Sequence, residues 1–487
     1  MNAQTTVYVC ERPPVREGPP LVDGKARFVV RSADVVARVI RDGRLHIRSI
    51  LLGYGRPHAM TIAKLTAFFV LLPRIAAAAD PTETASLRLQ DAVQLAVARN
   101  ERAQISDLQV VVAEAGVARA RAGFLPVVAL TASDQQHLGA VSSSTTNVGN
   151  SSATVNQPLV NAPAWPLYSQ AKALAEAQRA QNVDDKRLLS FSAATAFFAV
   201  LNADDFLQAA QRQLEMAKAN LADTQARAEA GLTSSNDVTR ARVDIGSAER
   251  QVEADKGNFD NAFVQLELTI NARVSGALVP PEATLRAAQQ SPGQVNALVK
   301  FATDRRPDVL AAKHATAAAH HFASEPLLRL VPTLGVQGAL TATTSPPPTG
   351  HWNDETVTAT LSWTLYDAGV RYADKRSRDA QATIADLTLQ QLLRSVDAQV
   401  RSAVALLVSA QAALRVADDA VKAARQSVEE TAILYRQGLA KAIELVDAND
   451  GRFTAEVNYA GAEYALAVAY LTLRQAMGLD PLGTELQ

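Results

Sequence analysis

Two copies of a glycine–leucine turn, 207 residues apart, constrain this chain more than any other feature. The first copy is Gly231-Leu232 and the second is Gly438-Leu439, and each stands between two long Ala-rich stretches of helical pattern. Gly can adopt the left-handed conformation that ends a helix, and the Ser and Asn residues at 234–236 can cap the next one. We therefore predict two helical hairpins with tight tips, in a chain made of two similar halves.

The stretches that flank these turns are too long for an ordinary globular domain. Residues 165–229 contain no Gly, and no Pro after Pro166, so at 1.5 Å per residue they predict a helix about 100 Å long. The corresponding stretch of the second half, which ends at Tyr435, predicts a second helix of about the same length. The shorter returning helices are predicted to end near Val274 and Gly478. An amphipathic run from Leu87 to about Ala122 predicts one helix before the first strands, and the Pro-containing residues 275–293 predict an irregular connection between the halves. Helices of this length need partners along their whole course.

Period-2 alternation marks two candidate strands in each half of the chain. The pair in the first half covers residues 128–133 and 152–159, and the first strand of the second half covers 334–340. The clearest strand is 356–365, whose odd-numbered residues are apolar and whose even-numbered residues carry hydroxyls. A strand with one apolar and one hydroxyl face fits either a water-soluble sandwich or a membrane barrel.

The number of strands limits the membrane alternative. A barrel needs about eight strands to close, and four from one chain are too few. The open edges of an incomplete sheet cannot face lipid, because their backbone groups would have no hydrogen-bond partners there. A membrane barrel therefore requires several chains to share it, and three copies would supply twelve strands.

The net charge of −1 combines two unlike regions. Residues 1–79 carry 12 Lys and Arg against 5 Asp and Glu, so residues 80–487 have a net charge of −8, which argues against nucleic-acid binding. No nucleophile elbow, phosphate loop, zinc or dinucleotide motif stands in a usable context, so we expect neither an enzyme nor a cofactor. His314, His320 and His321 are weak metal candidates, because adjacent His side chains diverge by about 100° on a helix and no Cys or carboxylate completes a set.

The N-terminal region predicts export. Residues 60–79 have the three parts of a signal peptide, namely a short basic segment, an apolar core and an Ala-x-Ala site ending at Ala79. We predict translation from Met60 and cleavage after Ala79, with 1–59 an irregular extension that is not made or is discarded; the alternative is an apolar helix of a cytosolic domain. Cys10 is the only cysteine, so the predicted mature chain has no thiol for a disulfide, a metal or a lipid anchor.

Four motifs together resemble the TolC-like outer membrane efflux protein family. They are a Leu-x-Leu-x-x-Ala-Val opening at 87–93, Arg-Pro-Asp at 306–308, Leu-Tyr-Asp-Ala at 365–368, and Tyr-x-x-Gly-Leu with a later Asp-Ala at 435–448. The resemblance covers residues 87–481, in both halves. It implies a mainly α fold with a small β part, in which a homotrimer builds a twelve-stranded barrel in the outer membrane and a long antiparallel coiled-coil α-barrel through the periplasm.

The resemblance also implies domain boundaries and partners. Residues 80–281 would form the first channel repeat, 282–481 the second, and 482–487 a tail. The inner ends of the helical hairpins would close like an iris and open when a periplasmic adaptor and an inner-membrane transporter dock. The transporter could be a proton-driven pump or an ATP-driven exporter.

Carried over by position, the acidic pair at the aperture of the family falls on Glu444 and Asp447, with Asp237 as the acidic residue of the first tip. Glu444 and Asp447 are three residues apart and so share a helix face, and threefold symmetry would make them two acidic rings that favour cations. The alternative for all three is that acids in the first turn of a helix simply complement its dipole. The basic gate residue of the family has no clean match, because Ala440 stands at its position with Lys441 beside it.

Two turns and two aromatic residues complete the candidate sites. The turns that match adaptor-docking positions of the family are Gly231-Leu232 and Gly438-Leu439. Trp363 and Tyr366 stand near a strand end and suit either a membrane-interface aromatic belt or a buried core.

We therefore expect an outer membrane exit duct with its helical part in the periplasm, which passes drugs, toxic compounds or secreted protein. The alternative is a periplasmic coiled-coil scaffold or adaptor without a membrane barrel. Such a protein would keep the helices but would not need strands with a lipid-facing side.

Overall fold

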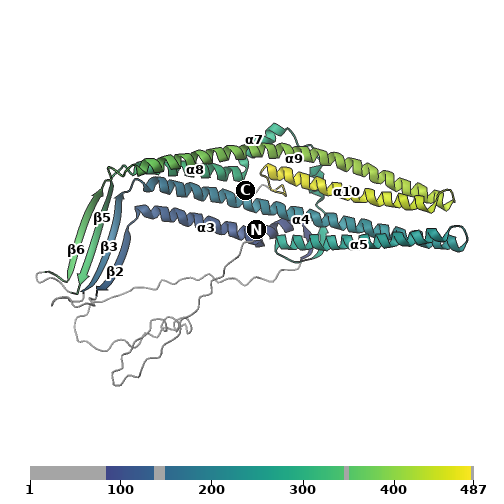
Figure 1. The fold of residues 1–487 in the computed structure, drawn as a ribbon, viewed down its shortest axis with the longest axis horizontal. Helices are drawn as coiled ribbons and strands as arrows, with labels where there is room; N and C mark the ends of the chain where they lie inside the picture. Colours follow the sequence, from purple (N-terminus) through teal and green to yellow (C-terminus); the bar gives the residue numbers. More distant parts are fainter. Residues whose placement is uncertain (1–83, 136–147, 345–349, 484–487) are drawn as a thin grey trace, which may run out of the picture. The chain divides into compact units, whose positions relative to one another are not determined.

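The computed structural model describes residues 84–135, 148–344 and 350–483, which are mainly helical with a small β part, as predicted (Figure 1). The predicted extension 1–59 and the predicted signal peptide 60–79 lie outside the described residues. The order helix, two strands, long helix, shorter helix occurs twice. Its first occurrence is α3 (Glu101–Arg121), β2 (Val127–Gln135), β3 (Val148–Val160), α4 (Ala164–Glu229) and α5 (Ser235–Ile270). Its second occurrence is α8 (Pro307–Leu328), β5 (Thr333–Thr343), β6 (Asn353–Ser362), α9 (Val370–Arg436) and α10 (Ala442–Ala476).

Two long hairpins make up most of the helical part. α4 has 66 residues and α9 has 67, so each is about 100 Å long at 1.5 Å per residue, as the sequence predicted. α5 and α10 run back along them (Figure 1). α5 ends at Ile270, before the predicted Val274, because Asn271 adopts a left-handed conformation with φ of 48° and closes the helix.

The core lies where the returning helices meet the middle of α4 and α9. Large side chains are almost completely buried there, whereas much of the remaining packing is between alanines, which lets helices approach closely. The first cluster contains Leu87, Phe197, Val200, Leu266, Ile270 and Leu471, and the second contains Val309, Val396, Val400, Leu407 and Leu466. Burying each of these side chains contributes about 1.5–3 kcal/mol, so the hairpins are anchored at mid-length rather than at their tips.

Four antiparallel strands form one sheet beyond one end of the helices, in the order β2-β3-β5-β6 (Figure 1). The four predicted strands are thus confirmed, but β2, β3 and β5 are longer than predicted. β6 also begins earlier, at Asn353, and ends at Ser362, so Trp363 lies just outside it. The outer edges of β2 and β6 pair with no other strand among the described residues.

The pairing register brings apolar side chains to one face of this sheet. Val128 pairs with Val155, which pairs with Gly338, which pairs with Val357, and these positions share a face. The alternation that was clear in β6 therefore extends across all four strands. Val128 and Val357 are 67% and 82% exposed, so this face has no cover within the described part of the chain.

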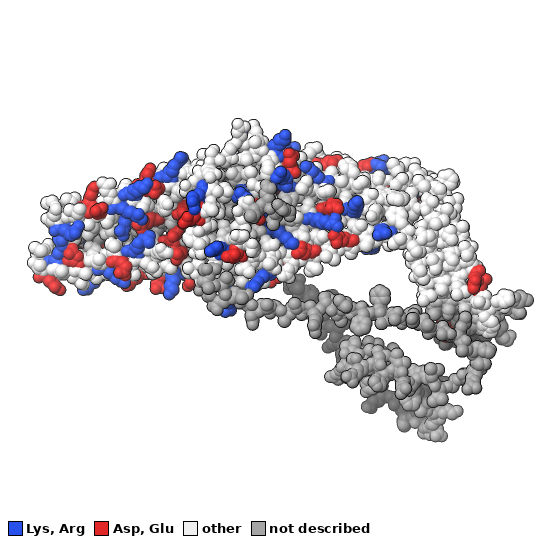
Figure 2. All heavy atoms as spheres, turned by 180° about the vertical axis from the view of Figure 1, so that it is seen from behind, with Lys and Arg blue, Asp and Glu red and all other residues white. Residues whose placement is uncertain are grey.

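Charge is distributed unequally between the sheet and the helices. Lys, Arg, Asp and Glu are interspersed along the helices, whereas the visible face of the sheet is almost uncharged (Figure 2). The charged residues of the four strands are Asp134, Asp354 and Glu355, all at the strand ends farthest from the helices. An uncharged sheet with an exposed apolar face is typical of contact with lipid.

Two predictions about connections were wrong, and one short strand was missed. The amphipathic run predicted from Leu87 to Ala122 is broken at Asn100 into α2 (Leu89–Arg99) and α3, and Asn100 caps α3 by accepting from the Arg102 N–H at 2.9 Å. The connection predicted to be irregular at 275–293 contains β4 (Val274–Val279) and α6 (Glu282–Ala288), and α7 (Val295–Arg305) follows it. β4 pairs in parallel with β1 (Thr84–Arg88), a short strand that sequence reasoning missed.

The Arg-Pro-Asp motif holds the far end of α10. The Arg306 guanidinium pairs with Asp308 at 2.7 Å and donates to the Ala476 carbonyl at 3.0 Å. Gly478 makes this contact possible, because its φ is +79° and an added Cβ would lie 2.8 Å from Arg306 Cγ. The C-terminal end of α10 is therefore fixed, while its N-terminal end carries the predicted gate residues.

Candidate functional site

Both hairpin tips end their long helix with the same backbone turn. Gly231 and Gly438 have φ of +72° and +78°, the left-handed conformation that Gly adopts without strain. The Leu232 N–H donates to the Arg227 carbonyl at 2.8 Å, and the Leu439 N–H donates to the Leu434 carbonyl at 2.9 Å. These bonds define a Schellman motif in each tip. The prediction that the glycines end the helices is confirmed.

The leucines that follow the glycines point into solvent. Leu232 is 75% exposed and Leu439 is 73% exposed. In many Schellman motifs the corresponding apolar residue packs back against its own helix. Leu232 and Leu439 bury little of their side chains in this way. Each tip therefore presents one large apolar side chain at its end.

The acidic residue of the first tip is held by its own turn. The Asp237 carboxylate accepts from the Thr233 hydroxyl at 2.6 Å, and from the Ser234 hydroxyl at 3.0 Å and its N–H at 3.2 Å. Ser234 caps α5 in return, which completes a capping box. The Thr233 bond and then the two Ser234 bonds hold the pKa of Asp237 below its usual value. This geometry fits the alternative in which Asp237 stabilises a helix start.

The acidic residues of the second tip have no such contacts. α10 begins after Lys441, whose side chain does not cap it. Glu444 and Asp447 lie in the first two turns, and both are exposed. Neither side chain makes a hydrogen bond or ion pair with any residue of the described part of the chain. They are therefore free to face a ligand, a neighbouring chain or a pore.

The two tips also contact each other. The Tyr435 ring is 6% exposed and stacks under the Arg227 guanidinium, 4.2 Å from the ring centroid. A cation–π contact of this kind contributes about 0.5–1 kcal/mol at a partly exposed site. Tyr435, from the last turn of α9, thus packs against the last turn of α4 in the other hairpin.

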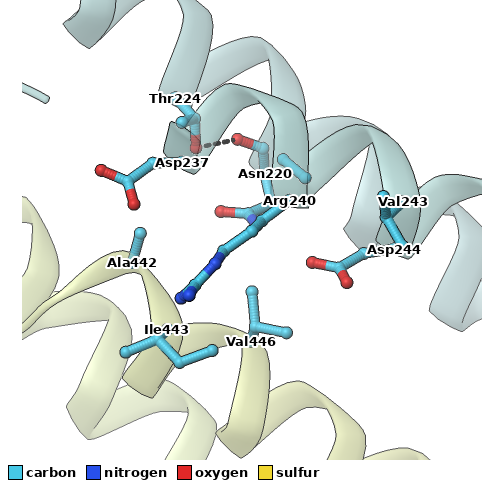
Figure 3. Close-up of a pocket in the computed structure, with 10 residues that line it drawn as sticks. Asn220, Thr224, Asp237, Arg240, Val243, Asp244, Ala442, Ile443 and Val446 are labelled. Carbon is cyan, nitrogen blue, oxygen red and sulfur yellow. Dashed lines mark hydrogen bonds between the residues drawn. The ribbon is translucent and has the colours of Figure 1, made fainter. Parts of the chain in front are cut away.

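A pocket of about 210 Å³ lies between the hairpins just behind the tips (Figure 3). It is lined by Asn220, Thr224, Asp237, Arg240, Ala241, Val243, Asp244, Ala442, Ile443 and Val446. The Arg240 side chain extends from α5 across the pocket toward Ile443 and Val446 of α10 (Figure 3). Arg240 pairs with no carboxylate among the described residues, although its positive charge adds to the lowering of the pKa of Asp237 and opposes part of the rise in the pKa of Asp244.

A second pocket, of about 260 Å³, continues the first one along the boundary between the two hairpins, which we call the seam. It shares Asn220, Asp244 and Val446 with the first pocket and adds Asp450 of α10. Burial first, and then the charge of Asp450, raise the pKa of Asp244. Burial also raises the pKa of Asp450, with Asp447 adding to the rise. Two carboxylates from different hairpins therefore meet in a partly desolvated place.

The aromatic residues near the sheet are exposed in a single chain. Trp363 is 58% exposed, and its indole N–H donates to the Leu330 carbonyl at 3.0 Å. Tyr366 is 84% exposed. Both lie just after β6, where the sheet meets the helices. Of the two readings of the sequence, this exposure favours the interface belt over a core within the chain.

The histidines do not form a metal site in the described part of the chain. His320 lies 3.1 Å from the Asp386 carboxylate, a contact that the sequence did not suggest because the two residues come from different helices. No group of three His, Cys, Asp or Glu side chains suited to a metal occurs among the described residues.

Sequence reasoning missed the residues of the seam. Arg240, Asp244 and Asp450 carry no motif, and they come close together because α5 and α10 both pack against α4. One signal was available, because Asp237, Arg240 and Asp244 follow a period of three to four on one face of a predicted helix. That pattern places charge on one face but does not say what the face meets.

Comparison with known proteins agrees with this arrangement of helices and sheet. The sequence model of the family described as "Outer membrane efflux protein" matches residues 92–272 and 298–479. Outer membrane protein TolC of Escherichia coli K12 is 25% identical over 352 residues, which cover 68% of this chain and 70% of that protein.

Solved structures of outer membrane channels share the fold. The Campylobacter jejuni CmeC outer membrane channel has a TM-score of 0.70 at 15% identity, covering 80% of this chain and 85% of that one. The Neisseria gonorrhoeae MtrE outer membrane channel, solved in an open state, has a TM-score of 0.71 at 18% identity, covering 82% and 91%.

Proposed function

The chain belongs to the outer membrane efflux protein family, and from that premise we propose that it is the exit duct of a tripartite export system. As an efflux channel of the outer membrane with a periplasmic helical part, it needs a partner that supplies cargo. We propose that a periplasmic adaptor and an inner-membrane transporter are these partners. The cargo we favour is drugs or toxic compounds, with secreted protein as the second candidate.

The observation that carries this proposal is the pair of open edges on an uncharged sheet. β2 and β6 each leave one edge unpaired within the described residues. Lipid offers no hydrogen bonds to such an edge, so each edge must pair with a strand of another chain. Four strands are too few to close a barrel alone, and we propose a homotrimer, whose twelve strands would leave no edge unpaired.

The helical part supports the same assembly. Among the described residues, α9 alone contains an 18-residue stretch apolar enough, by length and composition, to cross a membrane, with a mean hydropathy of 1.4. Only 33% of this stretch is buried within the chain. Because α9 belongs to a hairpin rather than to an isolated span, we propose that neighbouring chains cover the exposed remainder.

We propose that the two tips form the aperture and the adaptor contact. Glu444 and Asp447 would form stacked acidic rings, for which their exposure and lack of partners leave them free. Leu232 and Leu439 would be the apolar contacts for an adaptor. Asp237 is the weakest of the proposed gate residues, since its carboxylate is already occupied in the capping box.

We also propose that Trp363 and Tyr366 lie at the periplasmic interface of the membrane, where exposed aromatic residues with a polar group are favoured. The signal peptide at 60–79 and the two repeats at 80–281 and 282–481 remain part of the proposal. Edman sequencing of the mature protein should begin at Asp80, and a start upstream of Met60 would refute the processing scheme.

Oligomer and membrane assays test the proposal directly. The protein should sediment with outer membranes and migrate in electrophoresis as an oligomer that heating converts to a monomer. A barrel closed by strand pairing between chains predicts this heat-modifiable behaviour. A soluble periplasmic monomer would refute the channel and favour the coiled-coil scaffold.

A further inference from the structure

The helix ends that meet the sheet carry an excess of positive charge. The segments 114–124, 161–179, 322–332 and 363–379, which we call the junction, contain nine Lys and Arg against six Asp and Glu. Residues 80–487 as a whole have a net charge of −8, so the junction has the opposite sign to the chain around it. The four strands beyond the junction have no Lys or Arg among their described residues, and the sheet face visible in Figure 2 shows none.

Each acidic residue of the junction already has a basic partner. Glu114 and Glu176 both pair with Arg179 at 2.7 Å, and Asp367 pairs with Arg371 at 2.8 Å. The other three acids pair with basic residues of the junction in the same way, namely Glu325 with Arg329 and Arg378, Asp374 with Arg329, and Asp379 with Lys375. The excess positive charge therefore belongs to residues outside these pairs.

Four basic residues of the junction have no such partner. Arg119 and Arg121 of α3, Lys172 of α4 and Arg376 of α9 are all exposed. None of their side chains makes an ion pair or a hydrogen bond with any residue of the described part of the chain. At 1.5 Å per residue they lie within about 12 Å of the helix ends that meet the sheet. They form a group at one level of the molecule, on three different helices.

Exposed aromatic residues lie at the same level. Trp165 near the start of α4 is 63% exposed and Tyr372 near the start of α9 is 60% exposed, in addition to Trp363 and Tyr366. Exposed Trp and Tyr side chains are enriched at the membrane–water interface, so these rings mark the level where lipid headgroups are expected. The headgroup layer is about 5–8 Å thick on each side, and long basic side chains can extend along a helix to reach it.

We propose that Arg119, Arg121, Lys172 and Arg376 bind the phosphate groups of anionic phospholipids in the leaflet that faces the periplasm. Guanidinium and ammonium groups form charge-assisted hydrogen bonds with phosphate oxygens. Basic residues next to a membrane-embedded segment attract anionic lipids such as phosphatidylglycerol. The lipid supplies the negative charge that the junction lacks.

A neighbouring chain does not supply this charge instead. In the homotrimer proposed above, β6 of one chain pairs with β2 of the next, which places α9 beside α3 of the neighbouring chain. Arg376 would then approach Arg119 and Arg121 of that chain, all with the same charge. Threefold symmetry brings only the same six acids to this level, and each already has a partner. This step rests on the proposed function, whereas the charge excess of the single chain does not.

The lipid preference is tested with spin-labelled phosphatidylglycerol and phosphatidylcholine and electron paramagnetic resonance, on the full-length protein in phosphatidylcholine vesicles. We expect phosphatidylglycerol to be enriched about threefold at the protein surface, because each basic residue favours an anionic headgroup by up to about fivefold and not every boundary lipid meets one. Raising the salt to 1 M NaCl should remove most of the preference. Inorganic phosphate should lower it no more than NaCl of equal ionic strength, and a larger loss would show a site for a free anion and overturn the proposal.

Two variants with the same change in charge locate the site. Combining Arg119→Gln, Arg121→Gln, Lys172→Gln and Arg376→Gln should bring the enrichment close to one. The matched control changes four exposed basic residues far along the helices from the sheet, which likewise have no ion-pair partner among the described residues, and combines Arg242→Gln, Lys256→Gln, Arg394→Gln and Arg415→Gln. Both variants lose three Arg and one Lys, and the control should keep the preference of the unaltered protein.

Equal association of the two lipids with the unaltered protein, an unchanged preference in the junction variant, or the same loss in the control overturns the proposal. If the junction variant does not assemble, phosphatidylglycerol with a photoreactive headgroup decides on the unaltered protein. Cross-links to peptides containing residues 119, 172 or 376 support the site, and cross-links elsewhere alone refute it. Conductance of the same vesicles separates the two proposals. A lipid preference without conductance refutes the channel, and conductance without a lipid preference refutes this site.

Discussion

The two hairpin tips share one backbone turn but start their returning helices differently. Each long helix ends in a Schellman motif with a left-handed Gly and an exposed Leu. The first returning helix then begins with a full capping box between Ser234 and Asp237. The second begins after Lys441 with no side-chain cap. The acidic residue of the first tip therefore takes part in capping its own helix, whereas Glu444 and Asp447 of the second tip have no such contacts.

This difference suggests a division of roles. The first tip is locally stabilised, because a capping box contributes about 1 kcal/mol to a helix start. The start of α10 lacks this contribution, while its far end is fixed through Arg306. An element that is anchored at one end and weakly stabilised at the other is suited to local opening. We expect the second tip to be the part that moves.

The largest expected difference between the tips is in block of the channel by a multivalent cation. Glu444→Gln combined with Asp447→Asn should weaken block by La³⁺ at least tenfold, or about 1.4 kcal/mol, because the exposed acidic rings are lost. Conductance of the purified protein in planar bilayers measures this. Asp237→Asn is the control and should change block little. Equal effects from the two changes would contradict the division of roles.

Next in size is the effect of removing the tip glycines. Gly231→Ala and Gly438→Ala should each destabilise its turn by about 1 kcal/mol, since a residue with Cβ is strained at positive φ. An added Cβ meets no atom within 4 Å at either position, so the cost comes from the backbone alone and should be similar at both tips. Hydrogen exchange of the tip amides should become roughly fivefold faster. A cost at one tip only would show that the turns are not equivalent.

A smaller effect should follow from making the second tip resemble the first. Lys441→Ser creates a Ser-x-x-Glu capping box with Glu444 and should stabilise the start of α10 by about 0.5–1 kcal/mol. Hydrogen exchange in the first turn of α10 should slow. Ser234→Ala should speed exchange at the start of α5, as the converse change. Because the Glu444 carboxylate would then turn toward the backbone N–H of residue 441, block by the multivalent cation should also weaken. A stabilised helix with unchanged block would show that Glu444 does not face the pore.

The smallest expected effect is a pH dependence confined to the first tip. Hydrogen bonds from Thr233 and Ser234 hold the pKa of Asp237 below 3.8, its ordinary value. The stabilisation is therefore fully present above about pH 4 and is lost as the pH falls through the lowered pKa. Exchange of the amides at 234–238 should accelerate only in that acid range. Asp237→Asn should remove this dependence, and acceleration already at pH 5 would contradict the assignment.

Local sequence signals were enough to predict the main helices and strands and the two hairpin tips. Long stretches without Gly or Pro specify α4 and α9, and Gly231 and Gly438 specify the two turns, because helix length and left-handed turns depend on neighbouring residues. The alternation in β6 was equally clear. The break at Asn100 was missed, since a cap inside a continuous helical pattern does not disturb the periodicity. β1 and β4 were missed because short strands gain their stability from pairing with distant residues.

The sequence by itself determined a mainly helical chain with two hairpins, four strands of a sheet and the acidic residues near each tip. Only the tertiary structure decided that the Asp237 carboxylate accepts hydrogen bonds from its own turn while Glu444 and Asp447 have no such contacts, and that Asp244 and Asp450 line one pocket. Periodicity assigns a residue to a face of its own helix. Which groups that face meets depends on how helices distant in sequence pack together, and this packing determines the partners of each charge.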